Sequence, residues 1–276
     1  MGDGGQLPIY LINLDRRPDR LAFMAGQFEA LGLDFTRFAA IDAQTTSDAE
    51  IDLKIDPREA LIRMPRGSQC GALSHLAVWQ MIADGHAGAG IVFEDDMELS
   101  PGLVAISGDL TWLPSGVDLV QLERKGSKRP KLMGPVCSHA PDGREIRLLH
   151  SRAGGAGAYL ITRTAARRFL ATTGRLRLPI DHVLFNANIS KPARQSQIAA
   201  ILPALARQRR EDFASDITPT PVRPSLCRRL VRGWYEINRL PAQLLLMASG
   251  RAQPVKFEYV SRLTSKATGV GQPASE

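Results

Sequence analysis

The residues best suited to chemistry are three adjacent carboxylates, Glu94, Asp95 and Asp96, which directly follow the apolar run Ile91–Phe93. In an extended backbone the side chains of Glu94 and Asp96 point to one side and that of Asp95 to the other. Two carboxylates on one side suit a hard divalent cation, Mn²⁺ or Mg²⁺, with a substrate diphosphate completing its coordination. The alternative is an acidic loop that ends a strand and binds nothing.

A second polar segment, residues 13–20, follows the apolar run Ile9–Ile12. Four of its side chains could hold a nucleotide: Asn13, Asp15, Arg16 and Arg20. The alternative is a helix start with surface ion pairs. Neither GxGxxG nor GxxxxGK[ST] follows the apolar run, which disfavours a dinucleotide site and a P-loop.

The elements that must position these groups alternate between strands and helices. Strands are predicted at 9–12, 35–41, 91–93, 118–122 and 158–161. Helices are predicted from Pro18 to a stop at Gly32, across residues 73–82 after a loop at 65–67 and before Gly85, and through Phe169. This alternation indicates a layered α/β domain with a mostly parallel sheet. Ligands bind at the carboxyl ends of strands in such sheets, which is where the acidic triplet falls.

Four blocks in this order resemble glycosyltransferase family 25, the lipopolysaccharide and lipooligosaccharide glycosyltransferases, to which the collagen galactosyltransferases are related. The first block is the run from Ile9 to Arg20. The others are Ala72-Leu73-Ser74-His75-Leu76, Phe93-Glu94-Asp95-Asp96, and Ala158-Tyr159-Leu160-Ile161 followed by Pro179-Ile180-Asp181-His182. Together they cover roughly residues 8–190.

The resemblance implies a GT-A-like (Rossmann-like) nucleotide-sugar-binding domain that is β-galactosyltransferase-like. It implies inverting transfer from a UDP-sugar, typically UDP-galactose, to a hydroxyl of a glycan or lipid-linked oligosaccharide. In the family's DxD position Glu94 and Asp96 would bind the metal. The donor would be held by Asp95, together with Asn13, Asp15, Arg16, Arg20 and His75. Taken alone, His75 fits a buried core histidine better than a site residue.

Inversion also needs a general base for the acceptor hydroxyl, and Asp181 is the candidate because it follows Pro179 in a turn before a predicted helix start. Its alternative role is a helix N-cap. The neighbouring His182 could contact the metal or the acceptor. The stretch Gly67-Ser68-Gln69-Cys70-Gly71 lacks the glutamate of the family's Gly-Glu-x-Gly-Cys run and reverses its Gly-Cys order. A catalytically silent member that binds a glycan or a partner is therefore the second hypothesis.

The composition of the 276 residues narrows the class of protein. The three cysteines lack CxxC pairing, which excludes a disulfide scaffold and a cysteine zinc site. No apolar run reaches the roughly 18–20 residues of a membrane span. The first residues have no signal-peptide core, and a cytoplasmic protein is expected. The charge divides the chain into a nearly neutral glycosyltransferase domain, 1–215, and a linker and tail, 216–276, with nine basic and four acidic residues.

The tail contains an amphipathic helix pattern. Leu226, Leu230, Trp234 and Ile237 fall on one arc, and four arginines, Arg228, Arg229, Arg232 and Arg239, lie on the other side until Pro241. This pattern is typical of a helix at an anionic membrane surface, here the inner face of the cytoplasmic membrane. The alternative is a helix packed on the domain with solvated arginines. A nucleic-acid partner would depend on the tail's charge alone and is not expected.

Overall fold

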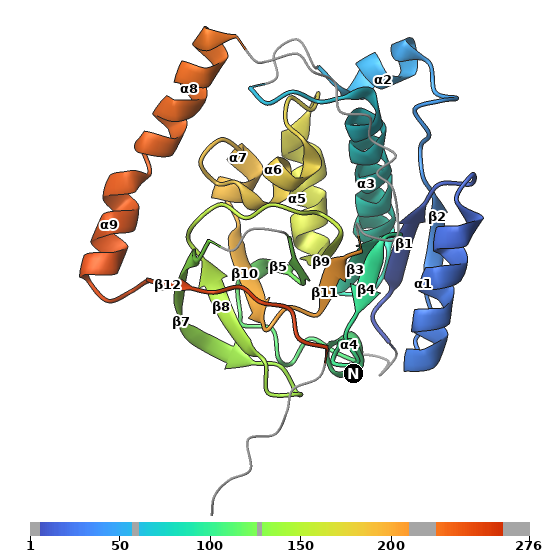
Figure 1. The fold of residues 1–276 in the computed structure, drawn as a ribbon, viewed down its shortest axis with the longest axis horizontal. Coiled ribbons are helices and arrows are strands. Elements are labelled where there is room, and N and C mark those ends of the chain that lie inside the picture. The colour runs from blue at the N-terminus through green and yellow to red at the C-terminus, as the bar shows by residue number, and fades with distance from the viewer. Residues whose placement is uncertain (1–5, 57–60, 126–128, 210–224, 262–276) are drawn as a thin grey trace, which may run out of the picture.

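The computed structural model describes residues 6–56, 61–125, 129–209 and 225–261 (Figure 1). The first five residues and the proline-containing linker at Pro219, Pro221 and Pro224 lie outside these ranges. The described chain forms a nine-stranded and a three-stranded sheet, with helices on both sides of the larger one.

The first unit confirms the predicted strand, helix and strand. β1 (Ile9–Asn13) is fully buried, α1 (Pro18–Leu31) begins at a proline, and β2 (Thr36–Ala39) lies beside β1. Gly32 ends α1 with φ of 64° and donates its N–H to the Glu29 and Phe28 carbonyls, a left-handed cap that favours glycine.

The second unit brings the acidic triplet to the sheet edge. It consists of α2 (Asp48–Lys54), α3 (Arg66–Asp84), β3 (Ala89–Glu94), β4 (Met97–Leu99) and α4 (Leu103–Ser107). α3 ends before Gly85 as predicted but begins earlier, because Pro65 already occupies its N-cap position. The expected loop at 65–67 is therefore wrong, and residues 66–71 form the first turns of a helix.

The remaining elements complete the sheets. They are β5 (Val117–Gln121), β6 (Glu123–Arg124), β7 (Lys131–His139), β8 (Glu145–Leu149), β9 (Ala158–Thr162), α5 (Arg163–Thr173), α6 (Ile180–Phe185), α7 (Lys191–Arg194), β10 (Gln197–Leu202), β11 (Ala206–Gln208), α8 (Leu226–Ile237), α9 (Leu240–Ala248) and β12 (Gln253–Val255). β5, β9 and α5 confirm predicted elements. β7, β8 and β10 fall where the sequence analysis predicted no strand.

The large sheet is mixed, in the order β12-β7-β8-β10-β5-β9-β3-β1-β2. β2, β1, β3, β5 and β10 run in one direction, as a mostly parallel sheet requires. β9 lies between β3 and β5 and runs against both. It enters the sheet at the edge where β3 and β5 end, since Ala158 pairs with Phe93 and Tyr159 with Gln121, so it must run back across the sheet.

Hydrophobic cores lie on both faces of this sheet. Along β1, Tyr10 and Ile12 join a core with α3 and α5 side chains such as Trp79 and Phe169. Ile9 and Leu11 alternate to the other face. Burial on both faces explains why β1 and β3 are continuous apolar runs, and why their polar carboxyl ends stand out in the sequence.

The end of the chain returns to the sheet. β12 pairs with β7, Tyr259 bridges to Ala204, and Phe257 is buried against Met133. The expected tail is therefore not separate from the domain along its whole length, although the division at residue 215 stays a prediction. None of the helices in the described ranges is long and apolar enough to cross a bilayer.

Candidate active site

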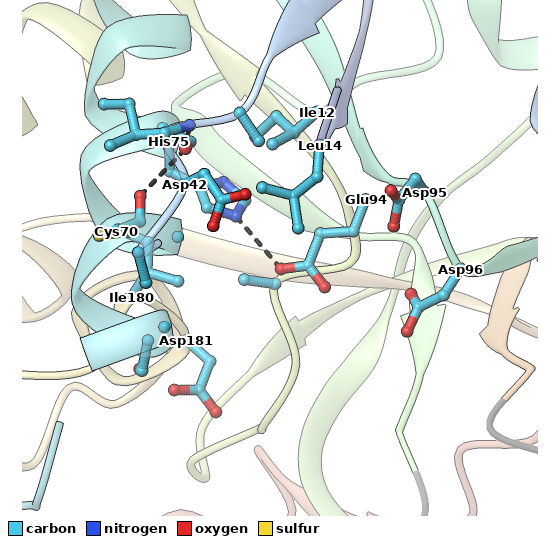
Figure 2. Close-up of a pocket in the computed structure, with 18 of the residues that line it drawn as sticks. Ile12, Leu14, Asp42, Cys70, His75, Glu94, Asp95, Asp96, Ile180 and Asp181 are labelled. Atoms are coloured by element: carbon cyan, nitrogen blue, oxygen red, sulfur yellow. Dashed lines mark hydrogen bonds and ion pairs between the residues drawn. The ribbon is translucent and has the colours of Figure 1, made fainter. Parts of the chain in front are cut away.

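A cavity of about 510 Å³ opens where β1 and β3 end (Figure 2). Most of the residues predicted for the site line it: Arg16, Arg20, His75, Glu94, Asp95, Asp96 and Asp181. Asn13 and Asp15 do not. The topology thus brings together side chains from the loop after β1, from α3, from the end of β3 and from α6, which are far apart in the sequence.

β3 ends at Glu94 and residues 95–96 form a turn, so the extended backbone expected through the acidic triplet is not present, and Asp95 is held by partners of its own. Its Oδ2 accepts a hydrogen bond from Asn13 Nδ2 at 2.7 Å, and its Oδ1 accepts one from Arg20 Nη1 at 2.9 Å. All three side chains are buried. This buried ion pair joins the loops after β1 and β3, so both Asp95 oxygens are engaged within the protein. Direct donor binding by Asn13 and Asp95 stays a prediction.

Arg16 and Asp15 differ in position although they are neighbours in sequence. Arg16 lies on the cavity wall, where its Nε donates to Asp42 Oδ2 at 2.7 Å. Asp15 is exposed and pairs with Arg37. Donor binding by Arg16 stays a prediction at a residue that lines the cavity. Donor binding by Asp15 stays a prediction at a residue outside the cavity lining.

A chain of hydrogen bonds connects the core to Glu94. Trp79 Nε1 donates to Tyr159 Oη at 2.7 Å, and Tyr159 Oη lies 2.9 Å from His75 Nδ1. Figure 2 shows the last contact, in which His75 Nε2 lies 3.3 Å from Glu94 Oε1. An indole N–H only donates, so the Tyr159 hydroxyl is left to donate to His75 Nδ1. Neutral His75 then carries its proton on Nε2 and donates it to Glu94.

This series of hydrogen bonds agrees with both interpretations of His75, whose side chain is buried and also lines the cavity. Its spacing of four residues from Trp79 places both on one face of α3. Burial would raise the pKa of Glu94, but the hydrogen bond from His75 and nearby positive charge hold that pKa below its usual value. Glu94 is therefore oriented and ionised at the cavity.

The pKa values of Asp96 and Glu123 are raised, in contrast to that of Glu94. Burial, followed by the charge of Glu94, raises the pKa of Asp96 to about 7 and that of Glu123 to about 8. Asp96 Oδ1 and both Glu123 oxygens are buried without a hydrogen-bond partner among the described residues. Without a cation, the region therefore holds more acidic groups than it can ionise.

The sequence analysis missed Glu123 and the glycines around it. A Cβ at Gly155 or Gly157 would collide with a Glu123 oxygen, and Gly155 also has φ of 99°. The loop Gly154-Gly155-Ala156-Gly157 therefore closes directly over the Glu123 carboxyl. The available signals were the glycine-rich spacing and a lone acidic residue directly after the apolar strand 117–121.

Without metal, the protein is expected to lose stability as pH rises. A carboxyl with a raised folded-state pKa favours folding while it is protonated, so Glu123 stabilises below its ordinary pKa of 4.5 and loses that contribution as pH passes about 8. The loss is a few kcal/mol at most, since one pKa unit is worth about 1.4 kcal/mol. Glu123→Gln should flatten the pH dependence measured by urea unfolding.

The exposed Glu29→Gln change on α1 is the matched control and should keep the full slope. We expect Asp96 to cause the pH dependence of the unfolding free energy that remains in Glu123→Gln, because its pKa is also raised by burial and by Glu94. Equal slopes in wild type and Glu123→Gln would show that Glu123 is already ionised at low pH.

Asp181 faces Glu94 and Asp96, the acidic pair, across the cavity (Figure 2). Its Oδ2 lies 3.7 Å from Lys125 Nζ and accepts a weak hydrogen bond from the Gly155 N–H at 3.4 Å. The alternative role as an N-cap is wrong, because Pro179 holds that position and Asp181 lies in the first turn of α6. Its carboxylate is thus held at the cavity wall.

His182 lies apart from the cavity. Its Nδ1 is 2.8 Å from Asn186 Nδ2, and the cavity lining does not include it. Burial, in the first place, lowers its pKa. Its suggested contact with metal or acceptor therefore has no support from the cavity's geometry.

The chemistry of the acidic pair fits a divalent cation that also binds substrate. Within the described ranges, no group of three or more His, Cys, Asp or Glu side chains could hold a metal by itself. Glu94 and Asp96 nevertheless offer hard oxygen ligands, and the buried Asp96 Oδ1 lacks a partner. Two protein carboxylates plus substrate oxygens are a common arrangement for Mg²⁺.

The altered stretch at 67–71 also contributes to the cavity. Gly67, Ser68, Cys70 and Gly71 line it from the first turns of α3. Three further lining residues escaped the sequence analysis: Asp42, Lys125 and Gln208. Gln208 hydrogen-bonds Asp96, and Lys125 is the cation beside Asp181. The departure from the family pattern therefore changes one wall of the cavity and leaves the acidic residues in place.

Fold and site together define a mixed α/β protein with an acidic ligand cavity at the carboxyl ends of its strands. The sequence profile of glycosyltransferase family 25 (LPS biosynthesis protein) matches residues 6–184, and the chain belongs to this family. The resemblance carried by the four sequence blocks is thereby confirmed.

Known relatives match parts of the chain. A "Glycosyltransferase 25 family member" of Aedes aegypti is 35% identical over 100 residues, which is 34% of this chain and 16% of that protein. The lacto-N-neotetraose biosynthesis glycosyltransferase LgtB of Neisseria gonorrhoeae is 26% identical over 185 residues, 64% of this chain and 66% of LgtB. LgtE of the same organism is 26% identical over 166 residues, 58% of this chain and 59% of LgtE.

Among solved structures, the apo-form glycosyltransferase GlyE of Streptococcus pneumoniae TIGR4 aligns with 91% of this chain and 66% of its own. The TM-score is 0.32 and the sequence identity 11%. A likeness at this level carries no argument about the site.

Proposed function

We propose that the protein is an inverting, metal-dependent hexosyltransferase with a GT-A-like fold. It transfers a sugar, expected to be galactose, from a UDP-sugar to a hydroxyl of a glycan or lipid-linked oligosaccharide in lipopolysaccharide biosynthesis. The observation that carries this proposal is one cavity with Glu94 and Asp96 on one side and Asp181 on the other. Family membership and the printed names of LgtB and LgtE support it.

The donor side of the cavity carries charges suited to a diphosphate. Arg16, Arg20 and Lys125 place cationic groups on its wall. Glu94 and Asp96 would hold Mn²⁺ or Mg²⁺, which supplies charge stabilisation for the departing diphosphate. His75 fixes the orientation of Glu94 through its hydrogen bond, so the carboxylate need not reorganise when the donor binds.

The acceptor side requires a group that takes a proton. As the acceptor oxygen bonds to the anomeric carbon, the bond from that carbon to the diphosphate oxygen breaks, and Asp181 takes the hydroxyl proton. Attack from the face opposite the leaving group inverts the anomeric configuration. Lys125 Nζ lies 3.7 Å from Asp181 Oδ2 and helps to hold the carboxylate in place.

The second candidate is a catalytically silent member of the family that binds a glycan or partner. The altered stretch 67–71 favours it, because four of those residues line the cavity. The retained acidic triplet and Asp181 favour the enzyme, since a binding protein does not need a buried carboxylate oxygen without a partner, Asp96 Oδ1, beside its ligand.

A panel of UDP-sugars tests the two candidates in the same samples. Donor binding is measured by calorimetry, and UDP release is measured with and without Mn²⁺. We expect one UDP-sugar to bind, and its release of UDP to require metal. Binding with no release in the presence of a lipooligosaccharide acceptor pool would favour the silent member, and the absence of both would exclude a UDP-sugar as the donor.

A further inference from the structure

Exposed apolar side chains concentrate on α8 and α9. Ten of the thirteen exposed large hydrophobic residues in the described chain lie between residues 226 and 247. Leu230 is 67% exposed, Trp234 64% and Leu245 70%. Isolated exposed leucines are ordinary, but a continuous apolar surface of this kind marks an interaction site.

The two helices meet the rest of the molecule through polar groups. Glu236 pairs with Arg152 at 3.0 Å, Arg239 Nη2 donates to the Ala187 carbonyl at 3.1 Å, and Gln243 Nε2 donates to the His150 carbonyl at 3.0 Å. Figure 1 shows α8 and α9 along one side of the molecule, outside the other helices. Their polar side therefore faces the body, and their apolar side faces outward.

Charge on the two helices is almost entirely positive. The four arginines of the helix pattern, Arg228, Arg229, Arg232 and Arg239, accompany a single acidic residue, Glu236, over residues 226–248. Trp234 and Tyr235 add aromatic groups of the type enriched at the boundary between headgroups and acyl chains. An apolar face flanked by arginines is complementary to an anionic lipid surface.

We propose that residues 226–248, the docking arm, bind the face of an anionic bilayer, with the exposed apolar side chains of α8 and α9 inserted and the exposed Arg228 and Arg229 near the lipid phosphates. The inference rests on the proposed function, because it supplies the surface that carries a lipid-linked acceptor.

A bilayer fits this surface better than a second copy of the chain. A two-fold interface through the apolar faces would bring the arginine flanks of two arms together, which costs energy through like-charge repulsion. An anionic bilayer instead takes the apolar face and the positive flanks at once. The bilayer also needs no shape complementarity from the bulky apolar side chains that the two helices present.

Vesicle binding by the full chain tests the docking arm without any sugar donor. Trp79 and Trp112 are buried, so Trp234 alone of the three tryptophans reports on the surface. We expect flotation with vesicles of phosphatidylcholine and phosphatidylglycerol, a blue shift of Trp234 fluorescence, and binding that weakens as salt rises. Vesicles of phosphatidylcholine alone should bind at least about tenfold less, because this zwitterionic lipid gives the bilayer no net negative charge to attract the arginines.

Matched variants separate insertion from folding. Leu230→Glu with Leu245→Glu should lower vesicle binding at least about tenfold, since charge at the inserted face is unfavourable. Leu53→Glu changes an equally exposed leucine on α2 (73%) and should bind like wild type. All three proteins should bind the UDP-sugar equally, so failure of the docking arm is distinguishable from failure of the proposed function.

The docking arm as a membrane surface is overturned if anionic vesicles do not bind, or if Leu230→Glu with Leu245→Glu binds them like wild type. Sedimentation at increasing protein concentration, without lipid, completes the test. A dimer that the Leu230→Glu and Leu245→Glu changes dissociate would assign the apolar face to a second copy instead.

Discussion

Asp181→Asn is expected to lower kcat by about 10²–10⁴-fold, the usual contribution of a general base. Asparagine keeps the size of the side chain and an oxygen for the Gly155 N–H, so the loop over Glu123 should remain in place. It cannot take the acceptor proton. UDP-sugar binding should stay within a few-fold of wild type, because the acidic pair and His75 are unchanged.

Turnover is measured with saturating donor across a pH series, with donor affinity in parallel. The Asn variant should lose most of the rate at every pH of the series, while its donor affinity stays near that of wild type. The exposed Asp84→Asn on α3 is the control and should keep both rate and profile. An Asp181→Asn enzyme with a wild-type rate would require another base, and its profile would show whether that base titrates.

Asp96→Asn is expected to reduce Mn²⁺ affinity measured in the presence of UDP, and to lower turnover by about 10²–10³-fold, as removal of one charge-stabilising group commonly does. The amide keeps one oxygen but loses the negative charge that a hard cation prefers. The same change relieves the repulsion from Glu94. The metal-free variant should therefore be at least as stable as wild type at neutral pH.

Loss of metal binding together with equal or higher stability separates a ligand from a residue that merely holds the fold. Mn²⁺ binding is followed by electron paramagnetic resonance and stability by urea unfolding. A variant that binds Mn²⁺ like wild type would remove Asp96 from the metal site. A variant that unfolds more easily would instead give Asp96 a structural role.

The sequence predicted the elements that depend on local signals. β1, α1 and the cap at Gly32 follow from an apolar run, a proline and a glycine in consecutive positions. The acidic ends of buried strands were equally visible, because β3 has no polar residue before Glu94. Alternation along an extended strand did not apply to the whole triplet, because β3 ends at Glu94 and residues 95–96 form a turn.

Features made by distant residues could not be predicted in this way. Asp95 finds Asn13 and Arg20 across separations of 82 and 75 residues, and no local pattern encodes such a pairing. The direction of β9 depends on the edge at which it enters the sheet. Glu123 becomes unusual only because Gly155 and Gly157 close over it.

The first turns of α3 offer a place to redesign which sugars the protein accepts. Gly67, Ser68, Cys70 and Gly71 line the cavity but carry no ionisable partner of the acidic residues, and a side chain at Gly71 would meet open space. A library at these four positions would reshape one wall while the carboxylates keep their places. Natural drift at 67–71 could alter substrate choice by the same route, without first disabling the enzyme.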